Sequence, residues 1–234
     1  MTSKDEIYKN IDYTLIYSKA NEYLATTSVI EVFPYKVKAF VEEQSDIRLC
    51  TYSKAMTKFG IDVKSFGSES AVIQEYCGAH IIFYNQDEQP YRVRFSIMHE
   101  FGHYILGHKM NLDVNDPLYG IQELEANCFA AQMVMPEQIL REAGKRGKMI
   151  SIDYIKKSFK VSEEAAEKRK KTLATNNYEW KKRSEKEFDD IIIFRYGAFI
   201  NRIAPKRIDY IDYDYEYQRQ QERDMYLDTR TRWS

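Results

Sequence analysis

The chain has 234 residues, 44% hydrophobic and 30% charged, which is enough apolar material for one or two domains with a real core. Its 35 basic and 36 acidic residues leave a formal net charge of −1, which excludes a general nucleic-acid coat and a polybasic membrane anchor. The N-terminus lacks the apolar core of a secretory signal, and no window approaches the roughly 18 apolar residues of a membrane span. We therefore expect a soluble, cytoplasmic protein without a membrane partner.

The first third of the chain predicts a helix followed by a small sheet. Apolar side chains recur at helical spacing over residues 7–24, which indicates an amphipathic helix. The segment 36–76 mixes helix and strand signals. Two β-rich runs, 71–76 and 79–84, are separated by a two-residue connection that contains Gly78, and this pattern predicts a hairpin.

The rest of the chain is mainly helical in pattern until about residue 176. Helices are expected over 92–106, with Gly107 as the stop, over 120–134, from Pro136 onward, and as a short pair within 150–176. Beyond 177 the composition changes: Ile191 to Phe194 has the pattern of a strand, and 206–232 is rich in Tyr and charged residues. We expect a boundary near residue 177.

The segment Met98-His99-Glu100-Phe101-Gly102-His103 carries the clearest chemical signal. Residues four apart on a helix share a face, so His99 and His103 can bind one metal ion, and Zn²⁺ suits this spacing. Glu100 can then act as a general base on a water molecule. The helix is apolar enough to be buried, and unpaired polar groups are costly there, so the three side chains must have partners.

An open catalytic zinc site needs a third protein ligand. His108 is nine residues after His99, about 180° around a continued helix, and is excluded on that geometry. His80, in the preceding strand, is a weaker candidate. Glu123 and Glu125 lie in the next helix, roughly 200° apart on a helical wheel, so only one can face the site.

The pattern of the second helix favours Glu125 of these two acids. Glu125 shares a stripe with the apolar Ile121, Cys128 and Phe129, whereas Glu123 shares a stripe with Asn127. A lone carboxylate on a buried stripe needs a cation. We therefore predict Glu125 as the third ligand and keep Glu123 as the alternative.

Three ordered sequence blocks within residues 70–175 resemble the ImmA/IrrE family of metallopeptidases. They are Ile81 to Asn85 with Arg94 to Leu106, then Glu123-x-Glu125-Ala126-Asn127-x-Phe129-Ala130-Ala131 with Met133, Met135 and Pro136, and finally Phe159 to Ser162 with Ala165, Ala166 and Arg169. The resemblance implies a zinc site whose third ligand is a Glu, a role we assign to Glu125. It also implies a helix-turn-helix transcriptional repressor of a mobile element, prophage or stress response as the substrate.

The predicted fold is therefore α+β, with a zincin-like core in which a small sheet packs on helices. We expect four parts: 1–70, an N-terminal helix and the start of the sheet; 71–149, the zinc metallopeptidase core; 150–176, a helical subdomain like a helix-turn-helix; and 177–234, a Tyr- and charge-rich extension. One Zn²⁺ per chain is expected, held by His99, His103 and Glu125, with Glu100 as the base of peptide hydrolysis. Tyr104 or His80 could stabilise the oxyanion.

Two other functional classes stay open. The helices of 150–176 carry several Lys and Arg residues, so the protein could instead bind DNA, although Glu163, Glu164 and Glu167 dilute that charge and no cluster suited to base recognition is present. A protein-interaction role of the zincin fold without hydrolysis is the other alternative. The Tyr-rich extension fits either a partner-binding surface or an ordinary structural addition.

Overall fold

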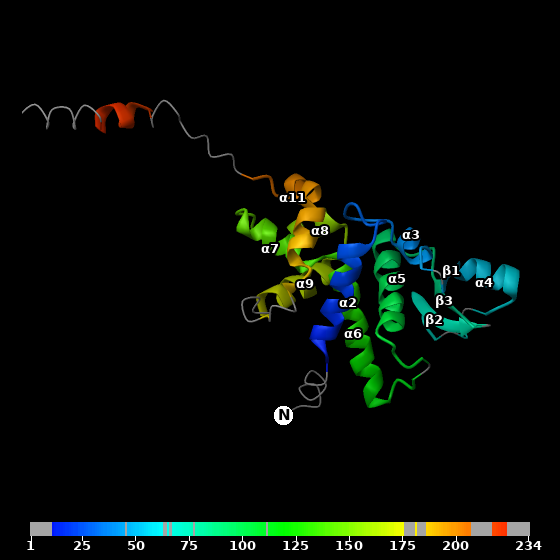
Figure 1. Ribbon diagram of the computed structural model, residues 1–234. Helices are drawn as coiled ribbons and strands as arrows, with labels where there is room; N and C mark the ends of the chain where they lie inside the picture. The colour runs from blue at the N-terminus through cyan, green and yellow to red at the C-terminus, as the bar shows by residue number, and fades with distance from the viewer. Residues whose placement is uncertain are drawn as a thin grey trace, which may run out of the picture. The chain divides into compact units, whose positions relative to one another are not determined.

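The computed structural model describes residues 11–44, 46–62, 65, 67–76, 78–110, 112–175, 181, 186–206 and 217–223. The elements in its first half are α2 (Tyr13–Thr26), α3 (Val37–Glu42), β1 (Ile47–Thr51), α4 (Tyr52–Phe59), β2 (Ala71–Tyr76) and β3 (Ala79–Tyr84). They are followed by α5 (Pro90–Ile105), α6 (Pro117–Val134), α7 (Glu137–Lys145), α8 (Ile152–Phe159), α9 (Glu163–Thr175), α10 (Asp189–Arg195) and α11 (Gly197–Ile203) (Figure 1). The mixed α+β class is confirmed.

The sheet has three strands in the order β1-β3-β2. β1 runs parallel to β3, with Ile47 opposite His80, and α4 lies in the connection between them. β2 and β3 form the predicted antiparallel hairpin. Gly78 in the turn has φ of 77°, a left-handed conformation that glycine adopts without a Cβ clash.

Helix α5 is the centre of the molecule. It contacts the strands β2 and β3 on one side and α6 on the other, and α6 in turn contacts α2 (Figure 1). α5 begins with Pro90 at its first turn, where the missing N–H costs nothing. Because α5 lies between the sheet and α6, its side chains meet residues from both layers.

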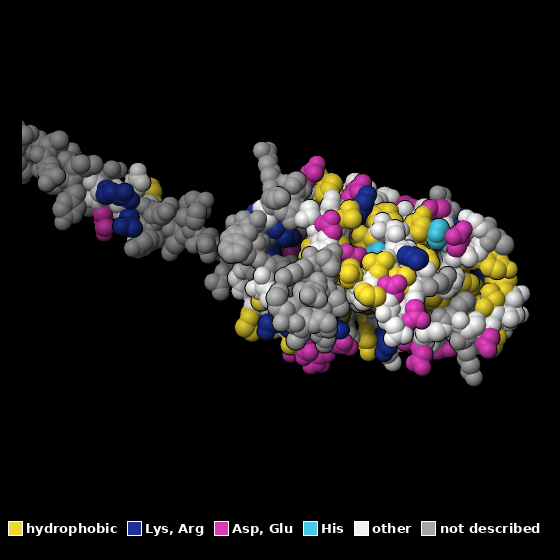
Figure 2. All heavy atoms as spheres, turned by 90° about the horizontal axis from the view of Figure 1, so that it is seen from below, with side chains coloured by type: hydrophobic (Ala, Val, Ile, Leu, Met, Phe, Trp, Pro, Cys, Tyr) yellow, Lys and Arg dark blue, Asp and Glu magenta, His cyan; other side chains and the backbone are white. Residues whose placement is uncertain are grey.

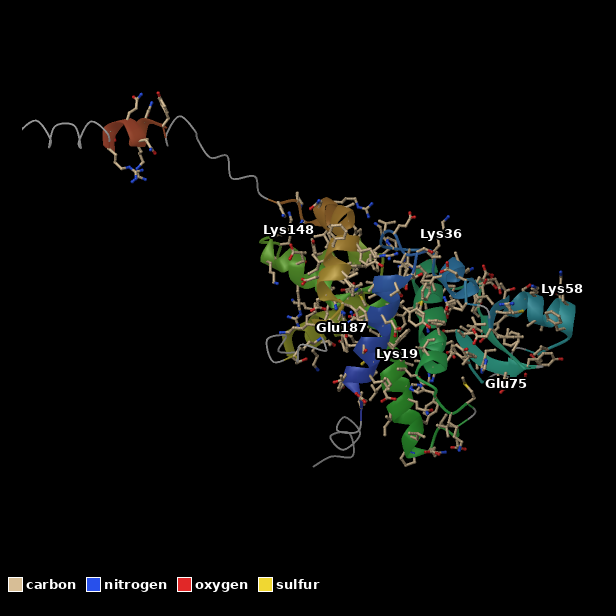
Figure 3. The ribbon with its side chains drawn as sticks, viewed as in Figure 1. Lys19, Lys36, Lys58, Glu75, Lys148 and Glu187 are labelled. Atoms are coloured by element: carbon tan, nitrogen blue, oxygen red, sulfur yellow. The ribbon has the colours of Figure 1, made fainter. Side chains whose placement is uncertain are left out.

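The core around α5 is built from interlocking aromatic rings. Phe101 makes edge-on contacts with Tyr23 of α2 and Phe40 of α3, at centroid distances of 5.5 and 5.4 Å. Phe129 of α6 lies 6.1 Å from the same ring. Each such pair adds about 0.5–1.5 kcal/mol beyond area burial. Side chains fill the space between α5 and its neighbouring helices and strands (Figure 3). This core fixes the position of α5 relative to α6.

The expected strand over 191–194 is wrong, because these residues form α10. Ile192 and Tyr196 are four apart and both fully buried, which is the spacing of a helix face rather than a strand face. The hydroxyl of Tyr196 donates to the carbonyl of Leu24 at 2.8 Å. Asp189 and Asp190 in the first turn favour a helix start through the helix dipole.

The division of the chain also differs from the expected boundary near 177. The structure separates into a compact unit of Met1–Ala204 and a second unit of Pro205–Ser234. Buried Ile192 of α10, Phe199 of α11 and Tyr196 between the two helices belong to the same core as residues of α5 and α6. Residues 189–203 are therefore part of the main unit and not of an extension.

The paired helices expected within 150–176 are present as α8 and α9, which contact each other. Arg169 of α9 is buried, and it donates to the carbonyl of Met135 at 2.8 Å. Lys156 pairs with Glu163 at 2.8 Å on the exposed side. The inward Arg169 and this ion pair reduce the cationic surface that DNA binding would need.

The Tyr-rich extension falls largely outside the described residues. Of its tyrosines, Tyr196 is buried in the main unit and Tyr217 is exposed, whereas Tyr210, Tyr213, Tyr215 and Tyr226 lie outside the described part. Residues 217–223 are helical. Within the described ranges, no helix has both the length and the apolar character to span a bilayer.

Candidate metal centre

Helix α5 presents His99 and His103 on one face while the rest of the helix is buried. Val93, Ile97, Met98 and Phe101 lie in the core, and this burial fixes the rotation of the helix about its axis. The two imidazoles are one turn apart, so both point to the same side. The structure places the two rings side by side, with their centroids 4.8 Å apart.

Gly102 allows α6 to approach α5 closely at this level. A Cβ on Gly102 would lie 3.1 Å from Cδ1 of Phe129 and 3.3 Å from the backbone oxygen of Ala126. Small residues at a helix contact shorten the distance between the two axes. The residue one turn before Ala126 on the same side of α6 is Glu123, and it is therefore brought to the two histidines.

Glu123 spans both imidazoles with its carboxylate. One oxygen, Oε2, lies 3.4 Å from Nε2 of His99, and the other, Oε1, lies 3.4 Å from Nε2 of His103. The two Nε2 atoms are 3.1 Å from each other. These three residues are the group of potential metal ligands found among the described residues. Histidine side chains are visible between acidic and hydrophobic ones in the view from below (Figure 2).

The spacing of these atoms fits a tetrahedral metal ion. Ligand atoms bound to Zn²⁺ at about 2.0–2.1 Å in tetrahedral geometry are roughly 3.3–3.4 Å apart. Burial alone would raise the pKa of Glu123, but its contacts with His103 and His99 outweigh that effect and hold this pKa well below its ordinary value. The carboxylate is therefore ionised, as a metal ligand must be. Two nitrogens and one carboxylate are a donor set that zinc accepts.

The structure brings Glu123, and not the predicted Glu125, to the His99 and His103 pair. Oε2 of Glu125 is 3.1 Å from Nε2 of His108, and its Oε1 accepts a long bond of 3.4 Å from the backbone N–H of Asp12. Both oxygens therefore have partners outside the His99 and His103 pair. The wheel argument failed because apolar residues surround α6 on most of its circumference, so no single stripe marks the side that faces α5.

His108 is not in the ligand group, but the reason for excluding it was incorrect. The exclusion assumed a continued helix, whereas α5 ends at Ile105 and Gly107 adopts a φ of 68°. This left-handed residue reverses the chain, and the N–H of His108 donates to the carbonyl of His103 at 3.0 Å. The imidazole of His108 thereby returns to the site, with Nδ1 2.9 Å from Nδ1 of His103.

Glu100 lies between the site and the sheet. Its Oε2 accepts a hydrogen bond of 2.9 Å from the backbone N–H of Ile73 in β2. Burial raises its pKa, while the neighbouring His99 and His103 lower it, and the net direction is upward. A carboxylate with a raised pKa is better matched to accepting and returning a proton near neutral pH.

Both residues expected as candidates to stabilise an oxyanion contact other groups in the structure. The hydroxyl of Tyr104 donates to Asp46, and the ring of His80 packs on Tyr104 at 4.7 Å. The sequence reasoning missed Tyr119, which is one turn before Glu123 on α6. Burial raises the pKa of Tyr119, and so do the charges of Glu123 and Glu100. The sequence signal that could have indicated Tyr119 is its position four residues before Glu123, because residues four apart on a helix are neighbours.

Comparison with known proteins agrees with this arrangement. The family model Peptidase_M78, described as the IrrE N-terminal-like domain, matches residues 54–171. The match begins in α4, before the blocks recognised from the motifs, and ends in α9. No curated protein matches the chain. The matched region contains both helices of the site, and it confirms the resemblance to ImmA/IrrE proteins. The chain belongs to the IrrE N-terminal-like family of metallopeptidase-like proteins.

Proposed function

We propose that the protein is a zinc-dependent endopeptidase that hydrolyses a peptide bond in a protein substrate. The observation that carries the proposal is the convergence of His99, His103 and Glu123 at 3.1–3.4 Å, with Glu100 beside them. The family match supports a peptidase rather than a purely structural metal site. The same arrangement favours hydrolysis over the alternative of a binding protein, since a structural zinc does not need an adjacent carboxylate such as Glu100.

The protein residues have distinct parts in this reaction. His99, His103 and Glu123 would hold one ion per chain, and a bound Zn²⁺ would supply Lewis-acid activation of water and of the scissile carbonyl. Glu100 accepts the proton that the attacking water loses and returns it to the leaving amine. The N–H of Ile73 holds one oxygen of Glu100 and so orients the carboxylate for this transfer. Holding the general base in its reactive position before the reaction lowers the entropic part of the activation barrier.

Tyr119 supplies the donor for the developing oxyanion in this proposal. Burial and the charges of Glu123 and Glu100 raise the pKa of its phenol, so the O–H keeps its proton. Replacing Tyr119 by Phe removes only the hydroxyl. We expect kcat to fall about 10²–10³-fold, the loss typical of one oxyanion donor, with metal affinity unchanged. Equal kcat for Tyr119→Phe and wild type in a peptide cleavage assay contradicts this role.

The first test is metal content together with turnover. Elemental analysis of purified protein should give about one zinc per chain in wild type and in Glu100→Gln, and none in His103→Ala. A peptide library from a digested proteome, analysed by mass spectrometry, should show cleavage by wild type only. Cleavage by Glu100→Gln at the wild-type rate overturns the assignment of the base, and absence of metal from wild type overturns the proposal as a whole.

We infer that the substrate is a helix-turn-helix transcriptional repressor, a class that the resemblance of the three sequence blocks favours. The probe is a set of purified helix-turn-helix repressors from the same genome, incubated with wild type and with Glu100→Gln. Specific fragments from one repressor, present only with wild type, support the inference. Cleavage of library peptides without cleavage of any repressor refutes the substrate class and leaves the endopeptidase proposal standing.

A further inference from the structure

His108 and Glu125, which are not in the candidate ligand group, form a hydrogen-bonded chain with His103 of that group. His108 has both ring nitrogens engaged: Nδ1 lies 2.9 Å from Nδ1 of His103, and Nε2 lies 3.1 Å from Oε2 of Glu125. The series His103, His108 and Glu125 begins at Nδ1 of His103, whereas Glu123 lies at Nε2 of the same ring. We propose that His108 and Glu125 are positioning residues that hold His103 in the orientation and tautomer needed to bind the metal.

The proton assignment follows from the chemistry of the last member. The carboxylate of Glu125 can only accept hydrogen bonds, so Nε2 of His108 carries the proton. A neutral imidazole has one N–H, and Nδ1 of His108 is therefore an acceptor. Nδ1 of His103 must donate to it across the 2.9 Å contact. His103 is then left with an unprotonated Nε2, the atom that lies 3.4 Å from Glu123 and 3.1 Å from His99.

Burial makes this chain a specific structure and not a surface contact. The side chain of His108 is 5% exposed and that of Glu125 is 17% exposed. A buried polar group without a partner costs free energy, so the observed contacts are strongly preferred to alternatives without them. The neighbouring rings of His103 and His108 are perpendicular, with centroids 4.9 Å apart, which suits an in-plane hydrogen bond from one ring to the other.

The backbone around His108 is held independently of the imidazoles. The left-handed Gly107 turns the chain, and the N–H of His108 is bonded to the carbonyl of His103 at 3.0 Å. Gln122 of α6, with its amide turned to satisfy both groups, donates to the carbonyl of Lys109 at 3.2 Å and accepts from its N–H at 2.9 Å. α6 therefore supplies Glu123 to the site, Glu125 to His108, and Gln122 to the loop that carries His108.

This arrangement explains why two acids two residues apart on one helix are both engaged at the centre. Glu123 contacts Nε2 of the imidazole of His103. Glu125 contacts His108, which in turn contacts Nδ1 of the same imidazole. A partner on the remote nitrogen of a metal-binding histidine fixes its ring and raises its basicity, and its loss typically lowers metal affinity 10–100-fold. The inference rests on the proposed metal site, but the tautomer of His103 can be measured without metal.

The experiment uses the full chain in two forms, free of metal and titrated with Co²⁺. In the metal-free protein, long-range ¹H–¹⁵N spectra of ¹⁵N-histidine report which nitrogen of His103 is protonated. We expect the Nδ1–H form in wild type and its loss in His108→Leu. Isothermal titration with Co²⁺ should show affinity lowered about 10–100-fold in His108→Leu and largely restored in His108→Gln, whose amide oxygen can accept the same proton.

Matched variants separate the possible causes. His80→Gln removes an imidazole that is not part of the hydrogen-bonded series of His103, His108 and Glu125, and this variant should bind Co²⁺ as wild type does. Circular dichroism shows whether each variant is folded, and His108→Gln keeps the test usable if His108→Leu does not fold. An Nε2–H form of His103 in metal-free wild type, or equal Co²⁺ affinity of wild type and folded His108→Leu, overturns the positioning role. Failure of wild type to bind Co²⁺ instead overturns the proposed metal site, and the spectra of His103 then decide the hydrogen-bonded chain alone.

Discussion

At the residue scale, Glu123 and Glu125 show how neighbouring acids on one helix acquire different partners. They differ by two positions, so their side chains leave α6 in different directions. Glu123 meets the Nε2 atoms of His99 and His103, and Glu125 meets His108. A residue's role here depends on which atoms of α5 and of the following loop it reaches, and not on its chemical type.

The two glutamates can be compared directly by amide substitution. Glu123→Gln removes a charged ligand, and we expect metal affinity to fall by at least about 100-fold, because the charge-assisted part of the coordination is lost. Glu125→Gln keeps an oxygen that can accept from His108, so its affinity should fall by less than about tenfold. Competition with a chromogenic chelator measures both. The reverse order of effects would restore Glu125 as the ligand.

At the scale of elements, the site depends on the distance between α5 and α6. α5 supplies His99 and His103, and α6 supplies Glu123, so the ligand set exists only while the two helices are in close contact. Gly102 and Ala126 allow that contact, and the aromatic cluster around Phe101 fixes its angle. The rigid core thereby determines the precision of the metal centre.

Gly102→Ala tests this dependence on helix spacing. The new Cβ would be 3.1 Å from Phe129 and 3.3 Å from the backbone of Ala126, and the backbone cannot rotate away. We expect a loss of about 1–3 kcal/mol in the free energy of unfolding, as in other overpacked cores, together with weaker metal binding. Urea denaturation and the chelator assay measure the two effects.

Gly120→Ala is the matched control for that substitution. Gly120 is also within a helix, here α6, but no heavy atom lies within 4 Å of a Cβ built there. The same change should therefore be neutral or stabilising, by up to about 1 kcal/mol, through the higher helix propensity of Ala. A similar loss of stability in both variants would show that helix spacing is not the cause.

At the scale of the whole molecule, the C-terminal helices α10 and α11 complete the core. Ile192, Tyr196 and Ile200 are fully buried, and Tyr196 bonds to the backbone of α2. Arg195 donates to the carbonyl of Ala25 at 3.1 Å, and Arg202 donates to that of Phe33 at 3.1 Å. These contacts join the last helices of the main unit to its first helical segment, so folding of the unit requires both ends.

Two truncations test this division. A chain ending after Ala204 retains the entire main unit, and we expect its Tm and its metal content to match those of the full chain. A chain ending after Lys186 loses four large buried side chains, each worth roughly 1.5–3 kcal/mol, which together approach the whole stability of a typical domain. It should be largely unfolded by circular dichroism. A folded chain ending after Lys186 would contradict the role assigned to α10 and α11.

The sequence by itself predicted that His99 and His103 share one helix face and that Glu100 stands beside them. His99, Glu100 and His103 follow from helical periodicity, which is a local property, and the apolar positions around them predict that the helix is buried. The hairpin of β2 and β3 was predictable for the same reason, since alternation and a glycine turn act over a few residues.

Only the tertiary structure decided which glutamate faces the two histidines, the return of His108 to the site and the helical state of 189–195. Glu123 is selected by the close approach of α5 and α6, which depends on the contact between Gly102 of one helix and Ala126 of the other. His108 is placed by the left-handed turn at Gly107 and by Gln122 on another helix. α10 is helical although Ile and Phe favour strands, because burial of Ile192 and Tyr196 against distant helices outweighs local propensity. Each of these outcomes depends on contacts between residues far apart in the chain, which local patterns do not record.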